Sequence, residues 1–196
     1  MRVLGLAGSP RRGGNTETLL DQALAGAAAA GAAVEKVLAC NLRMRGCLHC
    51  DGCLKTGVCV EKDDMVGLYP KLAEMDAFVL TSPLMFMAIS AQAKLVIDRL
   101  QCLWVAKYVL HQPASGGRKR PGLFISVGGM DRPDLFVGAR MTAKAAFATL
   151  DVRYTQELLY PKVDEKGAIR QHPTALADAF SAGQRLVRST TTTQET

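Results

Sequence analysis

The fold is decided by one stretch near the N-terminus, Arg2-Val3-Leu4-Gly5-Leu6-Ala7-Gly8-Ser9-Pro10-Arg11-Arg12-Gly13-Gly14-Asn15-Thr16. Its first part, residues 2–7, is a short apolar run that ends at once in turn residues, as is typical of a buried strand. Apolar residues then recur at helical spacing from Leu19 to Ala27, so we expect a helix capped by Asn15 or Thr16 that runs to about residue 30. A glycine-rich loop therefore joins a buried strand to a helix.

Strand-like and helix-like segments alternate along the rest of the chain. Further strands are predicted at residues 34–38, 77–81, 122–127 and 153–158, and further helices at residues 63–74, 90–104, 135–150 and 173–187. Five strands that alternate with helices predict an α/β fold with a doubly wound parallel sheet and helices on both faces. In one domain of this size they favour the flavodoxin-like order 2-1-3-4-5, with the ligand at the carboxyl ends of the strands.

The chain has 196 residues, a length that favours one domain. We assign residues 1–188 to a single flavodoxin-like domain with a cysteine-rich loop at residues 40–63. Residues 189–196 are mostly threonine without apolar periodicity, so we expect a disordered tail there.

The composition and charge limit the classes of partner. Lysine and arginine number 24 against 18 acidic residues, for a net charge of +6, but the positive residues are scattered and the densest group is Arg118-Lys119-Arg120. No aromatic-interleaved RNA motif or zinc-finger spacing accompanies them, so nucleic acid is not an expected partner. Attraction of an anionic cofactor is the other natural use of this charge.

The sequence carries neither a membrane span nor a secretion signal. The apolar run at residues 3–7 is too short for a signal peptide, and no stretch of about 18 apolar residues occurs. We therefore expect a cytoplasmic protein with no membrane partner. In a reducing compartment, clustered cysteines bind metal or do redox work more often than they form disulfides.

The loop after the first strand has the chemistry of a phosphate site. A helix N-terminus offers N–H groups and a positive dipole end, and the glycines allow close backbone approach. Ser9 and Thr16 add hydroxyls, Asn15 an amide and Arg11 a guanidinium. The Walker A and G-x-G-x-x-G patterns are both missing, so a nucleotide triphosphatase and a dinucleotide-binding domain of that type are disfavoured.

Gly8-Ser9-Pro10-Arg11 followed by Gly14-Asn15-Thr16 resembles the flavin-phosphate loop of the NADPH-dependent FMN reductase family of flavodoxin-like proteins. The resemblance implies that the FMN phosphate is held by Ser9, Arg11, Asn15 and Thr16. It covers residues 2–127 well, and the remainder fits only as generic strand and helix.

Two further loops resemble the family's flavin site. The segment Thr81-Ser82-Pro83-Leu84-Met85-Phe86 is similar to the loop beside the isoalloxazine ring, and Val127-Gly128-Gly129-Met130 to the glycine loop on its other side. This implies ring contacts from Ser82, Pro83, Leu84, Met85, Phe86, Gly128 and Gly129. Many relatives carry an aromatic residue directly after Ser-Pro-Val, where this chain has Met85 followed by Phe86.

Four cysteines follow the spacing C-x2-C-x2-C-x5-C, namely Cys47, Cys50, Cys53 and Cys59. Structural zinc sites usually pair two knuckles across a longer gap, whereas bacterial ferredoxins bind an iron–sulfur cube with a similar C-x2-C-x2-C run. Gly52 and Gly57 would allow the turns. Zinc, a disulfide or free thiols remain alternatives. Cys40 and Cys102 have no partner at ligand spacing and are interpreted as buried thiols.

The cysteine spacing also resembles the compact motif of iron–sulfur flavoproteins, a branch of the same family. That resemblance implies a 4Fe-4S cluster with Cys47, Cys50, Cys53 and Cys59 as ligands. On the helix at residues 90–104, Lys94 and Asp98 predict a surface ion pair, with Arg99 adjacent and assigned no role.

The resemblance implies an FMN-dependent oxidoreductase that uses NAD(P)H as electron donor to reduce a flavin, quinone or similar acceptor. FMN does the chemistry, so no side chain is nominated as a catalytic acid or base. Two alternatives stay open: an electron carrier served by ferredoxin without NAD(P)H activity, and a zinc-stapled flavodoxin-like binding domain. A homodimer or homotetramer is implied by the family.

Overall fold

The structure, a computed structural model, describes residues 1–191. Its strands are β1 (Arg2–Ala7), β2 (Ala33–Leu38), β3 (Ala77–Met85), β4 (Ala88–Ile89), β5 (Arg120–Val127) and β6 (Val152–Tyr160). A parallel sheet runs in the order β2-β1-β3-β5-β6. Since β5 and β6 are the fourth and fifth predicted strands, this order confirms the doubly wound, flavodoxin-like sheet.

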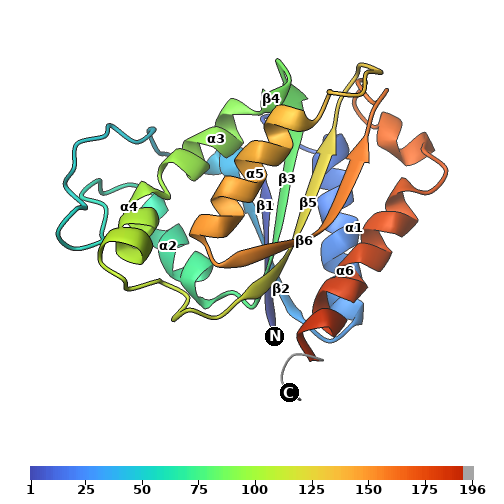
Figure 1. Cartoon of the computed structure of the whole chain (residues 1–196). Helices are drawn as coiled ribbons and strands as arrows, with labels where there is room; N and C mark the ends of the chain where they lie inside the picture. Colours follow the sequence, from blue (N-terminus) through green and yellow to red (C-terminus); the bar gives the residue numbers. More distant parts are fainter. Residues whose placement is uncertain (192–196) are drawn as a thin grey trace.

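Helices cover both faces of this sheet (Figure 1). They are α1 (Asn15–Ala29), α2 (Met65–Glu74), α3 (Ala91–Asp98), α4 (Gln101–Trp104), α5 (Val137–Thr149) and α6 (Ala175–Thr191). Helices α1 and α6 pack on one face, and α2, α3 and α5 pack on the other. Short 3-10 turns lie at Ala39–Asn41 and Ala168–Gln171. No helix among residues 1–191 is long and apolar enough to cross a membrane.

The strands have an apolar core on each side, which explains why they read as continuous apolar runs. In β3, for example, Val79 packs with the α1–α6 layer, whereas Phe78 and Leu80 pack with the opposite layer. Alternate residues of one strand therefore serve two separate cores.

The two helices α1 and α6 approach each other closely because each has a glycine at the contact. A Cβ on Gly26 would lie 1.9 Å from the Phe180 carbonyl oxygen, and one on Gly183 would lie 1.9 Å from the Ala23 carbonyl oxygen. Helix α6 continues to Thr191, so residues 189–191 are helical and the predicted tail begins too early. The rest of that predicted tail, residues 192–196, lies outside the described residues.

Strand β3 runs four residues beyond its predicted end, because Ser82 and Pro83 still pair with β5. It then turns back through Phe86 and Met87, both at positive φ (49° and 64°), into the short antiparallel β4 that the sequence did not predict. The predicted helix at 90–104 is divided into α3 and α4 at Arg99, whose carbonyl accepts hydrogen bonds from the Tyr69 hydroxyl and the Cys102 thiol. A π-helical turn, Val105–Val109, follows.

The predicted site residues lie in two separate regions of the fold. The carboxyl ends of β1, β3 and β5 meet at one edge of the sheet, and the loops that follow them lie side by side there. The cysteine-rich segment instead leaves the end of β2 and lies out beside α4 before it enters α2 (Figure 1).

Candidate functional site

A cavity opens at the carboxyl edge of the sheet, with about 710 Å³ of space that is partly open to solvent. Three predicted loops line it, together with the loop after β6: Ser9, Pro10, Arg11, Gly14, Asn15, Thr16, Pro83, Leu84, Met85, Val127, Gly128, Gly129, Val163 and Asp164. The structure thus brings together all of the predicted FMN residues except Ser82 and Phe86.

One end of the cavity is built for an anion. Helix α1 begins there with Gly14 as N-cap and no side-chain cap, so its first-turn amides have no intrahelical acceptor. The Thr16 hydroxyl is buried and has no hydrogen-bond partner among the described residues. Arg11 adds an exposed guanidinium at the same end. A buried, unsatisfied hydroxyl beside a helix N-terminus and a cation is a fitting receptor for a phosphate.

Ser9 shapes this loop from within. Its hydroxyl oxygen accepts a hydrogen bond from the Arg11 amide at 3.0 Å and lies 3.1 Å from the Arg11 carbonyl oxygen, to which it donates. The side chain of Ser9 therefore closes the turn that places Arg11 on the cavity.

The side chain of Asn15 lies on the cavity and also makes hydrogen bonds to the loop after β6. Its amide donates to the Glu165 carbonyl at 2.8 Å and accepts from the Gly167 and Ile169 amides at 2.9 and 3.3 Å. The side chain thus ties the loop after β6 to the start of α1. The tie also explains how Val163 and Asp164, which the sequence analysis missed, reach the cavity.

Glu17 stabilises the loop between β1 and α1 from the side opposite the cavity. Its buried carboxylate accepts a hydrogen bond from the Gly13 amide at 2.7 Å and forms an ion pair with Lys36 at 3.1 Å. Burial alone would raise the pKa of Glu17, but these contacts outweigh it and hold the pKa below the ordinary value. The loop is therefore fixed by a charged group on the side away from the cavity.

Ser82 holds the second loop instead of lining the cavity. Its hydroxyl is buried, donates to the Pro83 carbonyl at 2.9 Å and accepts from the Ser90 amide at 2.9 Å. Ser90 in turn donates from its hydroxyl to the Gly8 carbonyl, which links the second loop to the first. Phe86 does not reach the cavity, because it stands fully exposed at the tip of the β3–β4 turn.

The cavity as a whole fits FMN. Its anionic end can take a phosphate, and Pro83, Leu84, Met85 and Val127 give the other part an apolar wall for a ring system. A side chain on Gly128 would contact Leu84 at 2.8 Å, and one on Gly129 would lie 3.1 Å from Asp164. Glycine at these positions keeps the glycine loop close to its neighbours on the cavity wall.

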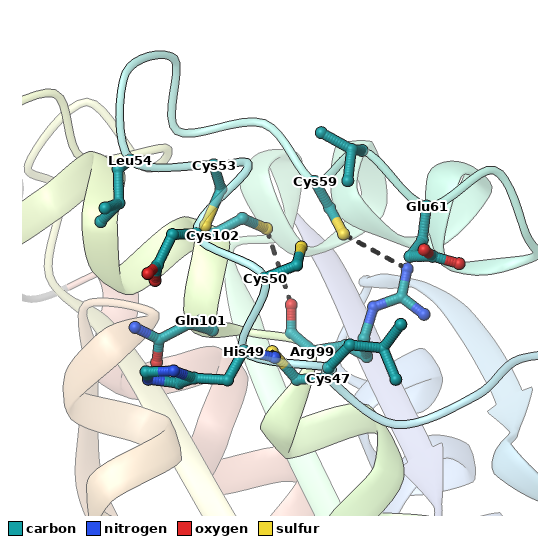
Figure 2. Close-up of a pocket in the computed structure, with 13 residues that line it drawn as sticks. Cys47, His49, Cys50, Cys53, Leu54, Cys59, Glu61, Arg99, Gln101 and Cys102 are labelled. Carbon is teal, nitrogen blue, oxygen red and sulfur yellow. Dashed lines mark hydrogen bonds between the residues drawn. The ribbon is translucent and has the colours of Figure 1, made fainter.

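A second cavity, with about 470 Å³ of partly solvent-open space, lies under the cysteine-rich segment. All four predicted ligands, Cys47, Cys50, Cys53 and Cys59, line it (Figure 2). Burial raises the pKa of the Cys53 thiol, and repulsion from Cys59, Cys47 and Cys50 adds to this effect. The structure thus places the four cysteines of the predicted ligand set on the wall of one cavity.

The segment winds around this cavity through residues in the left-handed region. His49, Asp51 and Gly57 have φ values of 52°, 59° and 69°. Gly57 thus provides a turn as predicted, whereas Gly52 does not adopt positive φ and instead lies against Val60. His49 lines the cavity, and its backbone amide donates to the Cys47 sulfur at 3.4 Å.

Two further residues line this cavity: Arg99, which the sequence analysis assigned no role, and Cys102, which it predicted to be a buried thiol. Arg99 is 2% exposed, and its guanidinium forms a bidentate ion pair with Asp63 at 2.6 and 3.1 Å. Cys102 is a buried fifth thiol on the same wall, and burial raises its pKa. A signal for Arg99 was present in the sequence, since it shares helical spacing with the buried Val96 and Leu103.

The donor set fits an iron–sulfur cluster. Among residues 1–191, no three histidine, cysteine or acidic side chains are grouped closely enough to hold a single metal ion. An iron–sulfur cube takes one thiolate at each of four corners, so its fit to this site rests on the four cysteine thiols that line one cavity. Four thiols spread over one cavity wall are suited to that arrangement.

Comparison with known proteins identifies the family of the chain. The sequence profile described as NADPH-dependent FMN reductase matches residues 1–154, which include the first three cavity loops and all four clustered cysteines. An iron-sulfur flavoprotein of Archaeoglobus fulgidus is 33% identical over 154 residues, covering 79% of this chain and 67% of the relative. An iron-sulfur flavoprotein of Methanocaldococcus jannaschii is 36% identical over 99 residues, covering 50% of this chain and 51% of the relative. The chain thus spans about two thirds of the length of the first relative and half of the second.

Among solved structures, a flavone reductase superposes with a TM-score of 0.71 at 19% identity, covering 96% of this chain and 62% of that one. At this identity the likeness concerns the fold alone. The profile match extends over most of the chain and includes the residues that build the phosphate end of the first cavity. The chain belongs to the NADPH-dependent FMN reductase family.

Proposed function

We propose that the protein is an FMN-dependent oxidoreductase, with FMN bound in the cavity at the carboxyl edge of the sheet. The observation that carries this proposal is the buried Thr16 hydroxyl, which has no partner among the described residues and lies at the anionic end of that cavity. When bound, FMN supplies transfer of two electrons as hydride or of single electrons. The residues of the chain bind its phosphate, orient its ring and shield one side of it from water.

The FMN assignment is tested by two neighbouring arginines. Arg11 lines the cavity. Arg12 does not line it, and its Nε lies 3.8 Å from the Glu17 carboxylate. Arg11→Ala is expected to weaken FMN binding about tenfold or more, because a charge-assisted hydrogen bond is worth about 1.5–3 kcal/mol. Arg12→Ala serves as the matched control for loss of charge. Equal FMN affinity in the two variants, measured by fluorescence titration of the apoprotein, would contradict the phosphate site.

We further propose that NAD(P)H donates the electrons and that a flavin, quinone or similar small molecule accepts them. The family description supports this donor, and the open cavity supports a small acceptor. Anaerobic addition of NADPH or NADH to the FMN-loaded protein should bleach the flavin absorbance. If neither bleaches it while reduced ferredoxin does, the alternative of a ferredoxin-linked electron carrier is correct.

The third part of the proposal is a 4Fe-4S cluster held by Cys47, Cys50, Cys53 and Cys59. It is supported by the four thiols on one cavity wall and by the names of the relatives. Cys53→Ser should lose iron and acid-labile sulfide but keep FMN, whereas Cys40→Ser, which removes a thiol outside this cavity, should keep both. Zinc in place of iron in the wild-type protein would favour the zinc-stapled domain instead.

The protein is also proposed to be a homodimer or homotetramer. The side chains of Met85, Phe86, Met130, Val137 and Met141, which lie on the segments after β3 and β5 and on α5, are exposed. Exposed large apolar groups are typical of interaction sites when they form one patch. Phe86→Glu should reduce the molar mass measured by light scattering, and an unchanged mass would place the interface elsewhere.

A further inference from the structure

Arg99 is the largest fully buried side chain among the described residues, and it lies on the wall of the cysteine cavity. A buried guanidinium has five N–H donors to satisfy. Nη1 donates to Asp63 at 2.6 Å and to the Arg45 carbonyl at 2.9 Å, while Nη2 donates to Asp63 at 3.1 Å. The remaining Nη2 contact is with sulfur: it lies 3.5 Å from Cys59 Sγ (Figure 2).

The charge of Arg99 is only partly offset by the protein. Asp63 is its single ion-pair partner, and the Nε donor is buried without any hydrogen-bond partner among the described residues. An arginine guanidinium is always protonated in proteins. Arg99 is therefore positive here, and it donates hydrogen bonds both to the Asp63 carboxylate and to the Cys59 sulfur.

We propose that Arg99 is a positioning residue that sets the reduction potential of the cluster, through its hydrogen bond to Cys59 and its buried positive charge. The inference rests on the proposed function, because it requires Cys59 to be a cluster ligand. Net charge, hydrogen bonds to sulfur and solvent exposure are the factors by which a protein tunes such a potential. Arg99 supplies two of them at one ligand.

The direction of the effect follows from the charge balance. Reduction adds one electron to the cluster, which comes from the reduced flavin or from an added reductant, and no bond forms or breaks. The cluster and its thiolates become more negative by one charge. A positive group fixed in a buried site stabilises that more negative state, since screening by water is weak there. Arg99 therefore raises the potential, and Asp63 opposes it.

The test uses two charge-neutralising variants, one that removes a positive charge and one that removes a negative charge, together with a surface control. Anaerobic redox titrations followed by electron paramagnetic resonance and by absorbance give the midpoint potentials of the cluster and of FMN separately. Arg99→Gln should lower the cluster potential and Asp63→Asn should raise it, each by about tenfold in the one-electron equilibrium constant, which is about 59 mV. Lys94→Gln removes a positive charge from the exposed face of the same helix and should leave the cluster potential unchanged.

The FMN potential should stay unchanged in all of these variants, and Arg99→Lys, which keeps the charge, should recover part of the lost potential. Full iron and sulfide content with an unmoved cluster potential in Arg99→Gln would overturn the role of Arg99. If Arg99→Gln does not retain iron, the Asp63→Asn variant becomes the test. An unchanged cluster potential in Asp63→Asn would then contradict the proposal. Wild-type protein with FMN but without iron and sulfide would instead contradict the proposed cluster.

Discussion

The Ser90 hydroxyl donates a hydrogen bond to the backbone carbonyl of Gly8. The same oxygen accepts from the Ala93 amide at 3.2 Å, so one side chain both caps α3 and holds the phosphate loop. Arg99 stands at the other end of α3, about 13 Å further along the helix axis by the rise of nine residues. One helix therefore connects the FMN cavity to the cysteine cavity.

Replacement of Ser90 by alanine should weaken both the fold and the FMN site. It removes the N-cap of α3 and leaves the Gly8 carbonyl without its hydroxyl donor, at a cost of about 1–3 kcal/mol. Urea unfolding and FMN titration measure the two effects. Ser181→Ala, in α6 on the opposite face of the sheet, is the control and should change neither. An Ser90→Ala protein of wild-type stability would contradict this role.

Thr16→Val should discriminate between FMN and riboflavin. The substitution preserves the shape of the side chain but removes a buried hydroxyl that is available for a phosphate oxygen. FMN affinity should fall about tenfold, as for loss of one hydrogen bond to a charged group, while riboflavin affinity stays the same. Thr149→Val, which removes a hydroxyl from the end of α5 at a residue that does not line the cavity, is the matched control. Equal losses for FMN and riboflavin would place the phosphate elsewhere.

Two glycine-to-alanine substitutions in helices should change the stability of the fold in opposite directions. At Gly26 the new methyl group would collide with the Phe180 carbonyl of α6, so overpacking should cost about 1–3 kcal/mol. At Gly67 in α2 nothing lies within 4 Å, and alanine should stabilise by about 0.5–1 kcal/mol through helix propensity. Thermal unfolding of both variants tests the packing of α1 on α6. The same sign for both would contradict it.

Glu17 should make the stability of the fold depend on pH in the acidic range. Its pKa is lower in the folded protein than its ordinary value of 4.5, so its contribution is fully present above that pH. The contribution is lost as the pH falls through the folded pKa, where the carboxylate takes up a proton. Glu17→Gln should therefore be about 1–3 kcal/mol less stable at pH 7, and the difference should shrink below about pH 4.5. A difference that is constant between pH 7 and pH 3 would contradict the assignment.

Sequence patterns allowed a prediction where the informative residues are neighbours in the chain. The apolar run of β1, its glycine loop and the cysteine spacing all predicted structure or a site from neighbours in the chain. The two-residue β4 was missed because so short a strand has no periodicity to detect. Its pairing depends on the turn at Phe86 and Met87, which lacks the usual asparagine or glycine.

Residues whose role depends on distant partners could not be assigned in this way. The position of Asn15 in the sequence predicts a helix cap, but its side chain forms hydrogen bonds with residues 150 positions or more further along the chain. Arg99 was adjacent to an expected surface ion pair, which the structure confirms between Lys94 and Asp98 at 2.6 Å. Its burial requires Asp63, which precedes it by 36 residues. Helical spacing could indicate that Arg99 faces inward, but the partners of these side chains follow from the tertiary fold alone.

The central claim is that one chain holds FMN at the sheet edge and a cluster under the cysteine-rich segment. Anaerobic purification with quantification of flavin, iron and acid-labile sulfide tests it most directly. The expected result is a coloured protein with iron and sulfide in equal amounts, about four of each per FMN. Flavin without iron, or zinc in place of iron, would contradict the cluster, and a protein that binds no FMN would contradict the account as a whole.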